Sequence, residues 1–199
     1  NACVSAYGQI KSAVEGVRDA ANKLSDPKTF GAVKSSVVGS SVSAAASVGA
    51  VAGQYFVQVN TLATAQTLQL QTADPNAAIG AGGSITFTLA DGTAATVAVG
   101  NDSSLKGIVK TINTTDGVGV RASILNDGNG NSYLMLMAKN TGMQAVVSTI
   151  TVDGNADLSA LLAFDGNGNP DLFNLKQSTP AADASITING IPVTSGSNK

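Results

Sequence analysis

The sequence contains no histidine and no tryptophan, one cysteine (Cys3) and one glutamate (Glu15). Histidine is the commonest general base and a common metal ligand, so its absence argues against most acid–base and metal-dependent enzymes. A single cysteine excludes an intramolecular disulfide within these residues. We therefore expect no catalytic residue, no metal ligand, no bound cofactor and no enzymatic activity.

Charge is also scarce, at 12% of the residues with a net of −2. The lysines and arginine of the N-terminal segment are spread along it, as on a solvated helix face, so no nucleic-acid-binding surface is indicated. Residues 1–24 lack the apolar core of a signal peptide, and no run is long enough to span a membrane. The chain also lacks an initiator methionine, so we expect a fragment of a longer protein.

The apolar residues are mostly small. The chain is 43% hydrophobic but only 4% aromatic, and it contains 22 glycines. Alanine, valine, serine and threonine favour thin sheets over the thick core of an α/β enzyme. Together with the hairpins and the N-terminal helix described below, the composition predicts a mainly β protein with small antiparallel domains and one N-terminal helix.

That helix is predicted at residues 3–24 from an apolar heptad stripe. The residues of the stripe, spaced alternately by four and three, are Cys3, Tyr7, Ile10, Val14, Val17, Ala21 and Leu24. An isolated helix of this length is marginal in water, so the stripe needs partner helices. No other segment has a comparable heptad, which places the partner in another subunit or outside these residues. The alternative is an amphipathic helix packed on the β domain. Cys3 is expected to act as a small core residue.

Alternating apolar residues predict the strands that follow. A half-buried strand is expected near residues 53–60, after a connector at 31–52 that includes strand pieces such as 41–45. Residues 83–138 predict a hairpin with Asp-Gly at its tip, a short helix starting after Asp102-Ser103-Ser104, and a second hairpin, with the helix covering one sheet face. Further along, a strand is expected at 146–152 and a short helix at 158–162.

Three other features receive structural interpretations. The Asp-x-Asn-x-Asn loops that start at Asp127 and Asp165 lack the glycine and glutamate of an EF-hand, so turns are expected instead of calcium sites. The strand near Tyr133 is apolar on both faces. We expect its second face, with Tyr133, Met135 and Met137, to lie in the core in preference to an interface.

Four motifs together resemble the flagellar cap proteins, also called hook-associated protein 2 (the FliD family). After the heptad helix come Leu-Ser-Asp-Pro-Lys-Thr-Phe at 24–30 and Gly-Gln-Tyr-Phe-Val-Gln-Val-Asn-Thr-Leu-Ala-Thr-Ala-Gln at 53–66. The hairpin, helix and hairpin at about 83–138 resemble the flagellin IN motif, through Ser104-Leu105, Ile112-Asn113 and Val120-x-Ala122. Ile186-Thr-Ile-Asn-Gly-Ile-Pro-Val193 resembles a later strand of the family. The order of these motifs makes the resemblance fairly specific.

The resemblance implies a leg-and-head subunit. Residues 1–44 would form part of a helical leg and a connector, 45–178 a β-rich head of one or two subdomains, and 179–199 a final strand segment returning toward the leg. The leg would pack through part of the stripe: Tyr7, Ile10, Val14, Val17 and Leu24. Family members assemble into small rings at the extracellular filament tip, where they promote flagellin polymerisation. The implied partners are further copies, flagellin, hook–filament junction proteins and, for adhesion, a host surface receptor. Export would use the flagellar type III pathway, without membrane insertion.

Two other readings stay open at this point. The IN motif also occurs in flagellins and hook–filament junction proteins, so the chain could be the variable head domain of either. The Leu-Ala-x-Ala-Gln ending favours the cap protein. A secreted adhesin or glycan-binding β-module would instead expose aromatic side chains on a shallow surface, for which Tyr55, Phe56 and Tyr133 are the candidates.

Overall fold

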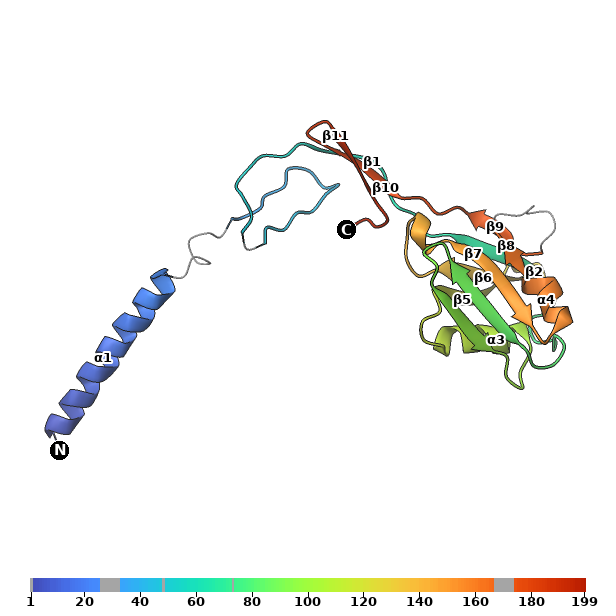
Figure 1. Ribbon diagram of the computed structural model, residues 1–199, viewed down its shortest axis with the longest axis horizontal. Helices are drawn as coiled ribbons and strands as arrows, with labels where there is room; N and C mark the ends of the chain where they lie inside the picture. The colour runs from blue at the N-terminus through green and yellow to red at the C-terminus, as the bar shows by residue number, and fades with distance from the viewer. Residues whose placement is uncertain (1, 26–32, 48, 73, 167–173) are drawn as a thin grey trace. The chain divides into compact units, whose positions relative to one another are not determined.

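The computed structural model describes residues 2–25, 33–47, 49–72, 74–166 and 174–199 (Figure 1). The chain divides into two compact units, residues 1–55 and 56–199. In the first unit, helix α1 (Ala2–Ser25) confirms the helix predicted from the heptad stripe. The described residues between 33 and 52 contain no strand, so the strand pieces expected near 41–45 are wrong. No residue described in that segment pairs with a strand of the three sheets, and its serines and alanines are mostly exposed.

The second unit contains three antiparallel sheets, which confirms the mainly β fold class. Strands β1 (Val57–Thr61), β10 (Ala184–Ile188) and β11 (Ile191–Ser195) form a three-stranded sheet, here called the small sheet. A second sheet has the order β5-β6-β2-β9, and a third has the order β4-β3-β7-β8. Their strands are β2 (Thr67–Thr72), β3 (Ser84–Leu89), β4 (Ala94–Ala98), β5 (Val120–Asn126), β6 (Ser132–Ala138), β7 (Val147–Asp153), β8 (Phe164–Asp165) and β9 (Lys176–Thr179).

The hairpin–helix–hairpin block is confirmed in its elements but not in its expected arrangement. The first hairpin, β3–β4, belongs to the third sheet, whereas the second, β5–β6, belongs to the second sheet. Helix α3 (Leu105–Thr114) packs mainly on β5 and also reaches β4, so it contacts both sheets instead of covering one face. The strand β7 and the helix α4 (Ala156–Leu162) also lie where the sequence predicted them. A short 3₁₀ turn (Met143–Ala145) leads into β7.

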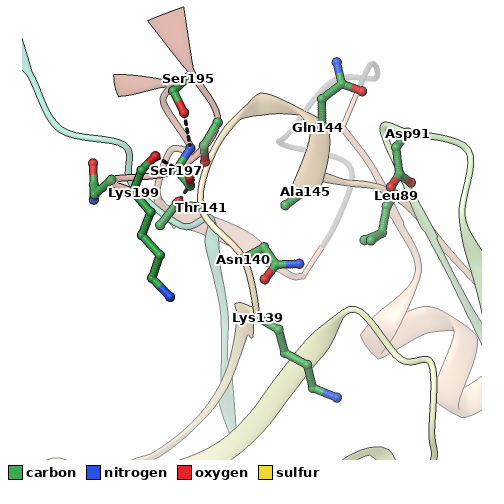
Figure 2. Close-up of a pocket in the computed structure, with 12 residues that line it drawn as sticks. Leu89, Asp91, Lys139, Asn140, Thr141, Gln144, Ala145, Ser195, Ser197 and Lys199 are labelled. Atoms are coloured by element: carbon green, nitrogen blue, oxygen red, sulfur yellow. Dashed lines mark hydrogen bonds between the residues drawn. The ribbon is translucent and has the colours of Figure 1, made fainter. Parts of the chain in front are cut away.

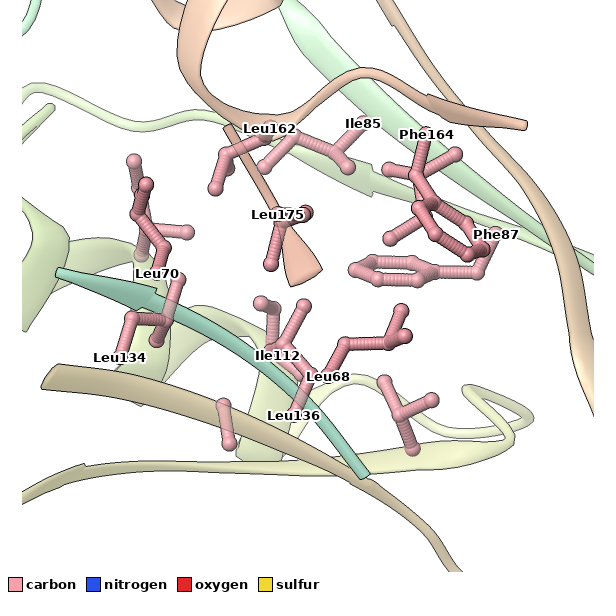
Figure 3. Packing of buried hydrophobic residues seen from close by; sticks show 14 of the residues in the cluster. Leu68, Leu70, Ile85, Phe87, Ile112, Leu134, Leu136, Leu162, Phe164 and Leu175 are labelled. Atoms are coloured by element: carbon pink, nitrogen blue, oxygen red, sulfur yellow. The ribbon is translucent and has the colours of Figure 1, made fainter. Parts of the chain in front are cut away.

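One hydrophobic core joins the second and third sheets with α3 and α4. Its largest fully buried side chain is Phe87, which lies close to Phe164 in Figure 3. Leu68 and Leu70 from β2 and Leu134 and Leu136 from β6 enter it from the second sheet (Figure 3). Every second residue of these strands therefore points inward, as a two-layer arrangement requires.

Two strand predictions need correction in the small sheet. Residues 184–194 form a hairpin, not one strand, because Asn189 and Gly190 both have positive φ values, of 50° and 85°. Consecutive positive values at Asn-Gly are those of a tight two-residue hairpin turn. The strand expected from residue 53 starts only at Val57, and Tyr55 lies outside it and is 64% exposed. The Asn189 side chain holds this start, because its Oδ1 accepts a hydrogen bond of 2.8 Å from the Phe56 backbone N–H.

Candidate assembly surfaces

Helix α1 exposes its entire apolar stripe. The proposed packing residues are exposed by 75% (Tyr7), 63% (Ile10), 62% (Val14), 71% (Val17) and 63% (Leu24). Cys3 is also exposed, so the core position expected for it is not present in this structure. Large apolar side chains in a heptad register are typical of a helix that is buried against other helices. The stripe is therefore a candidate assembly surface.

The small sheet has a second exposed apolar surface. The strand register places six β-branched residues on one face: Val57, Val59, Ile186, Ile188, Ile191 and Val193. The opposite face is polar, and there the Asn60 amide donates to the Thr187 hydroxyl at 3.1 Å. Ile191 is 65% exposed and Val193 is 38% exposed. A sheet with one apolar face is stabilised when a second layer covers that face.

The residues of the IN motif have structural roles. Ser104 caps helix α3, because its hydroxyl accepts a hydrogen bond of 3.1 Å from the Gly107 N–H. The Asn113 amide pairs with the edge strand β5 as another strand would: its Nδ2 donates to the Ala122 carbonyl at 2.8 Å, and its Oδ1 accepts from the Ala122 N–H at 3.0 Å. The motif therefore links the helix to the edge of the second sheet.

Replacing this amide should loosen the edge. We expect Asn113→Leu to lower the free energy of unfolding by about 1–3 kcal/mol, because both polar groups of buried Ala122 lose their partner. Thr114→Leu, on the next residue of the same helix, is the matched control, since the Thr114 hydroxyl bonds only to carbonyls of its own helix. Urea denaturation of both variants measures the difference. Equal midpoints would show that the amide contributes nothing.

Gln66, the last residue of the Leu-Ala-x-Ala-Gln motif, has a structural role that the sequence alone did not predict. The side chain is 2% exposed and connects both large sheets. Its Oε1 accepts a hydrogen bond of 2.8 Å from the Val147 N–H at the start of β7, and its Nε2 donates to Gln177 of β9 at 2.8 Å. A buried amide with both groups bonded fixes the register of the elements that it joins.

Three exposed aspartates have a lowered pKa, in each case because a turn donates hydrogen bonds to the carboxylate. The chief donor is the Thr93 backbone N–H for Asp91, the Ser104 hydroxyl for Asp102 and the Asn131 side-chain amide for Asp127. A lowered pKa adds stability above the ordinary aspartate pKa, and this stability is lost as the pH falls through the lowered value. These carboxylates therefore close turns. The second Asp-x-Asn-x-Asn loop lies mostly outside the described residues.

An open pocket of about 590 Å³ lies where residues 195–199 meet the connection between β6 and β7. Backbone and amide groups already bond to each other around it: Asn198 pairs with the N–H and carbonyl of Ala63 at 2.7 and 3.0 Å, and the Thr141 hydroxyl donates to Gly196 at 2.8 Å. Asp91, Lys139 and Lys199 do not converge on one point in Figure 2. The pocket is therefore a junction between chain segments.

The described residues form neither a metal-binding cluster nor a membrane-spanning helix. Within these ranges, no three cysteine, aspartate or glutamate side chains lie close enough together to hold a metal ion. None of the described helices combines the length and the apolar composition needed to cross a bilayer.

Comparison with known proteins identifies the family. The family model described as "Flagellar hook-associated protein 2 N-terminus" matches residues 1–66. The crystal structure of the D2–D3 domains of the flagellar cap protein FliD from Escherichia coli is 31% identical, with a TM-score of 0.71, over 78% of this chain and 80% of that chain. The chain belongs to the flagellar hook-associated protein 2 (FliD) family.

Two further comparisons extend the match. A structure of the D1–D2–D3 domains of E. coli FliD aligns with 98% of this chain and 55% of that chain, with a TM-score of 0.83 and 31% identity. The flagellar hook-associated protein 2 of E. coli (strain K12) is 36% identical over 138 residues, which are 64% of this chain and 28% of that protein. The chain thus spans less than a third of this curated relative. FliD proteins are structural cap proteins of the flagellum, which agrees with the prediction of a non-enzymatic protein.

Proposed function

We propose that this chain is the leg start and head of a flagellar cap subunit, which forms a small ring at the filament tip and promotes the polymerisation of flagellin there. The observation that supports this most is the apolar stripe of α1, fully exposed in a chain of the FliD family. Burying each of its large apolar side chains would contribute roughly 1.5–3 kcal/mol. Packing of this kind can hold a ring together without any cofactor.

The coverage of two solved structures supports a division into leg and head. The matched share of the chain rises from 78% with the D2–D3 structure to 98% with the D1–D2–D3 structure. We therefore assign α1 to the D1 leg and the sheets to the D2–D3 head. Tyr7, Ile10, Val14, Val17 and Leu24 would contact leg helices, and the apolar face of the small sheet would be covered in the complete subunit. Export by the flagellar type III pathway belongs to the same proposal, as do contacts with flagellin and the hook–filament junction.

Light scattering coupled to size exclusion tests the proposal, applied to residues 1–199 and to the full-length protein. We expect the shorter chain to stay monomeric and the full-length protein to form a ring of defined mass. In a strain that lacks its cap protein and therefore loses flagellin into the medium, expression of the full-length protein should restore the incorporation of flagellin into filaments. A full-length protein that stays monomeric at every concentration, and leaves flagellin in the medium, would contradict the proposed function.

A further inference from the structure

The solvent face of the second sheet carries an apolar strip where polar side chains are usual. Burial alternates along β6: Leu134 and Leu136 are buried, whereas Tyr133, Met135 and Met137 point to the other side. Met137 is 46% exposed, so the core position expected for this face is wrong. Leu125 of β5 lies opposite Tyr133 in the register and is 58% exposed. An antiparallel sheet with one solvated face normally places polar residues there.

The charge of this face is opposite to that of the rest of the head. Its described strands place the exposed Arg121 opposite Met137, and no aspartate occupies an outward position on them. Residues 56–199 as a whole contain more aspartates than lysines and arginines, so the head is acidic. The exposed turns carry several of these aspartates, among them Asp91, Asp116 and Asp127. A positively charged apolar face on an acidic domain is complementary to the remaining surface of another such domain.

The edges of the same sheet do not offer an alternative way to associate. At the β5 edge, the Asn113 amide already occupies both backbone groups of Ala122. The β9 edge is four residues long and carries Lys176, and a short, charged edge discourages strand addition. Both edges therefore disfavour strand addition, which leaves the face of the sheet as the larger surface for association.

We infer that the outer face of the second sheet, centred on Met135 with Leu125, Tyr133, Met137 and Arg121, docks against aspartate-bearing turns on the head of a second copy of this chain. Two copies that met through the same face would bring two positively charged faces together, which is unfavourable, so the contact joins two different surfaces. Contacts between different surfaces close into rings when the rotation between copies permits. The inference rests on the proposed ring and names a head surface that stabilises it.

Sedimentation velocity of the full-length protein over a range of concentrations tests this contact. Met135→Asp introduces a charge at the centre of the strip, and Arg121→Glu reverses the charge of the face. We expect each change to weaken self-association at least tenfold. Raising the salt concentration should weaken the wild type more than Arg121→Glu, because exposed charges are screened. Thr151→Asp, an exposed residue on the outer face of β7, is the matched control and should change the association less than twofold.

The outcomes separate this inference from the proposed function. Thermal unfolding followed by circular dichroism must show that the variants stay folded, and Arg121→Glu, a change at an exposed side chain, decides the question if Met135→Asp is unstable. A wild type that forms rings while both variants assemble equally well would overturn the docking face and leave the ring intact. Variants that assemble normally but lose binding to flagellin would also overturn it, since the face would then serve another protein. A wild type that never assembles would overturn both proposals.

Discussion

Full-length protein with Ile10→Asp is expected to remain monomeric at concentrations at which the wild type assembles. Ile10 lies in the middle of the exposed stripe of α1, between Tyr7 and Val14. In the assembled leg, an aspartate at this position would lose the burial energy of the isoleucine, roughly 1.5–3 kcal/mol, and would add the cost of desolvating a charge. Because every copy in the proposed ring would contribute one leg, the loss would be repeated at each subunit. Light scattering measures the effect directly.

The control for this prediction lies two residues away. Ser12 points to the side of α1 opposite the stripe, so Ser12→Asp introduces the same side chain at a position that should stay in solvent. Its helix propensity changes by only a few tenths of a kcal/mol. We expect the Ser12→Asp protein to assemble as the wild type does. Assembly that survives Ile10→Asp, with unchanged helix content, would show that the stripe is not the leg contact.

The sequence predicted local elements well because its apolar periodicity is clear. The heptad spacing identified α1, the Asp-Gly turn identified the β3–β4 hairpin, and Ser104 marked the start of α3. Each of these signals acts over a few residues, and each was confirmed. The flagellar motifs, taken in their order along the chain, also pointed to the FliD family.

Contacts between distant segments were harder to predict. Nothing local indicates that the hairpins on either side of α3 enter different sheets, because this depends on which strands they meet. The sequence showed Gln66 only as the end of a motif, yet its amide bonds to both β7 and β9. Its partner in β9, Gln177, lies more than one hundred residues further along the chain. The face of Met135 was assigned to the core because periodicity shows which residues share a face, but not what covers it.

The assembly surfaces show the same limit. The spacing alone indicated that Tyr7, Ile10 and Val14 share one side of a helix, and the structure shows that side exposed. Which helices cover it depends on surfaces beyond the described residues. The packing role of the stripe therefore stays a prediction, and Ile10→Asp is its direct test.

Phe87→Ala should have the largest effect on the stability of the head. Phe87 is 1% exposed on β3 and belongs to the core that joins the second and third sheets. Truncating a buried phenylalanine typically costs about 3–5 kcal/mol, because the transfer energy is lost and a cavity remains. For a unit of this size, such a loss lowers the melting temperature by roughly 10–15 °C.

Phe56 supplies the same substitution on the surface. Its side chain is 75% exposed, and its hydrogen bonds with Asn189 use only the Phe56 backbone, so Phe56→Ala should leave the melting temperature within about 2 °C of the wild type. Comparing both variants by calorimetry on residues 1–199 isolates the value of burial. Because α1 is exposed along its length, Phe87→Ala should lower the melting temperature of the head and leave the leg contacts intact. Ile10→Asp should do the reverse: the melting temperature of the head should stay unchanged, and the full-length protein should no longer form the ring. If Ile10→Asp lowered that melting temperature as much as Phe87→Ala does, α1 would be part of the head's own folding unit, and the division into leg and head would be wrong.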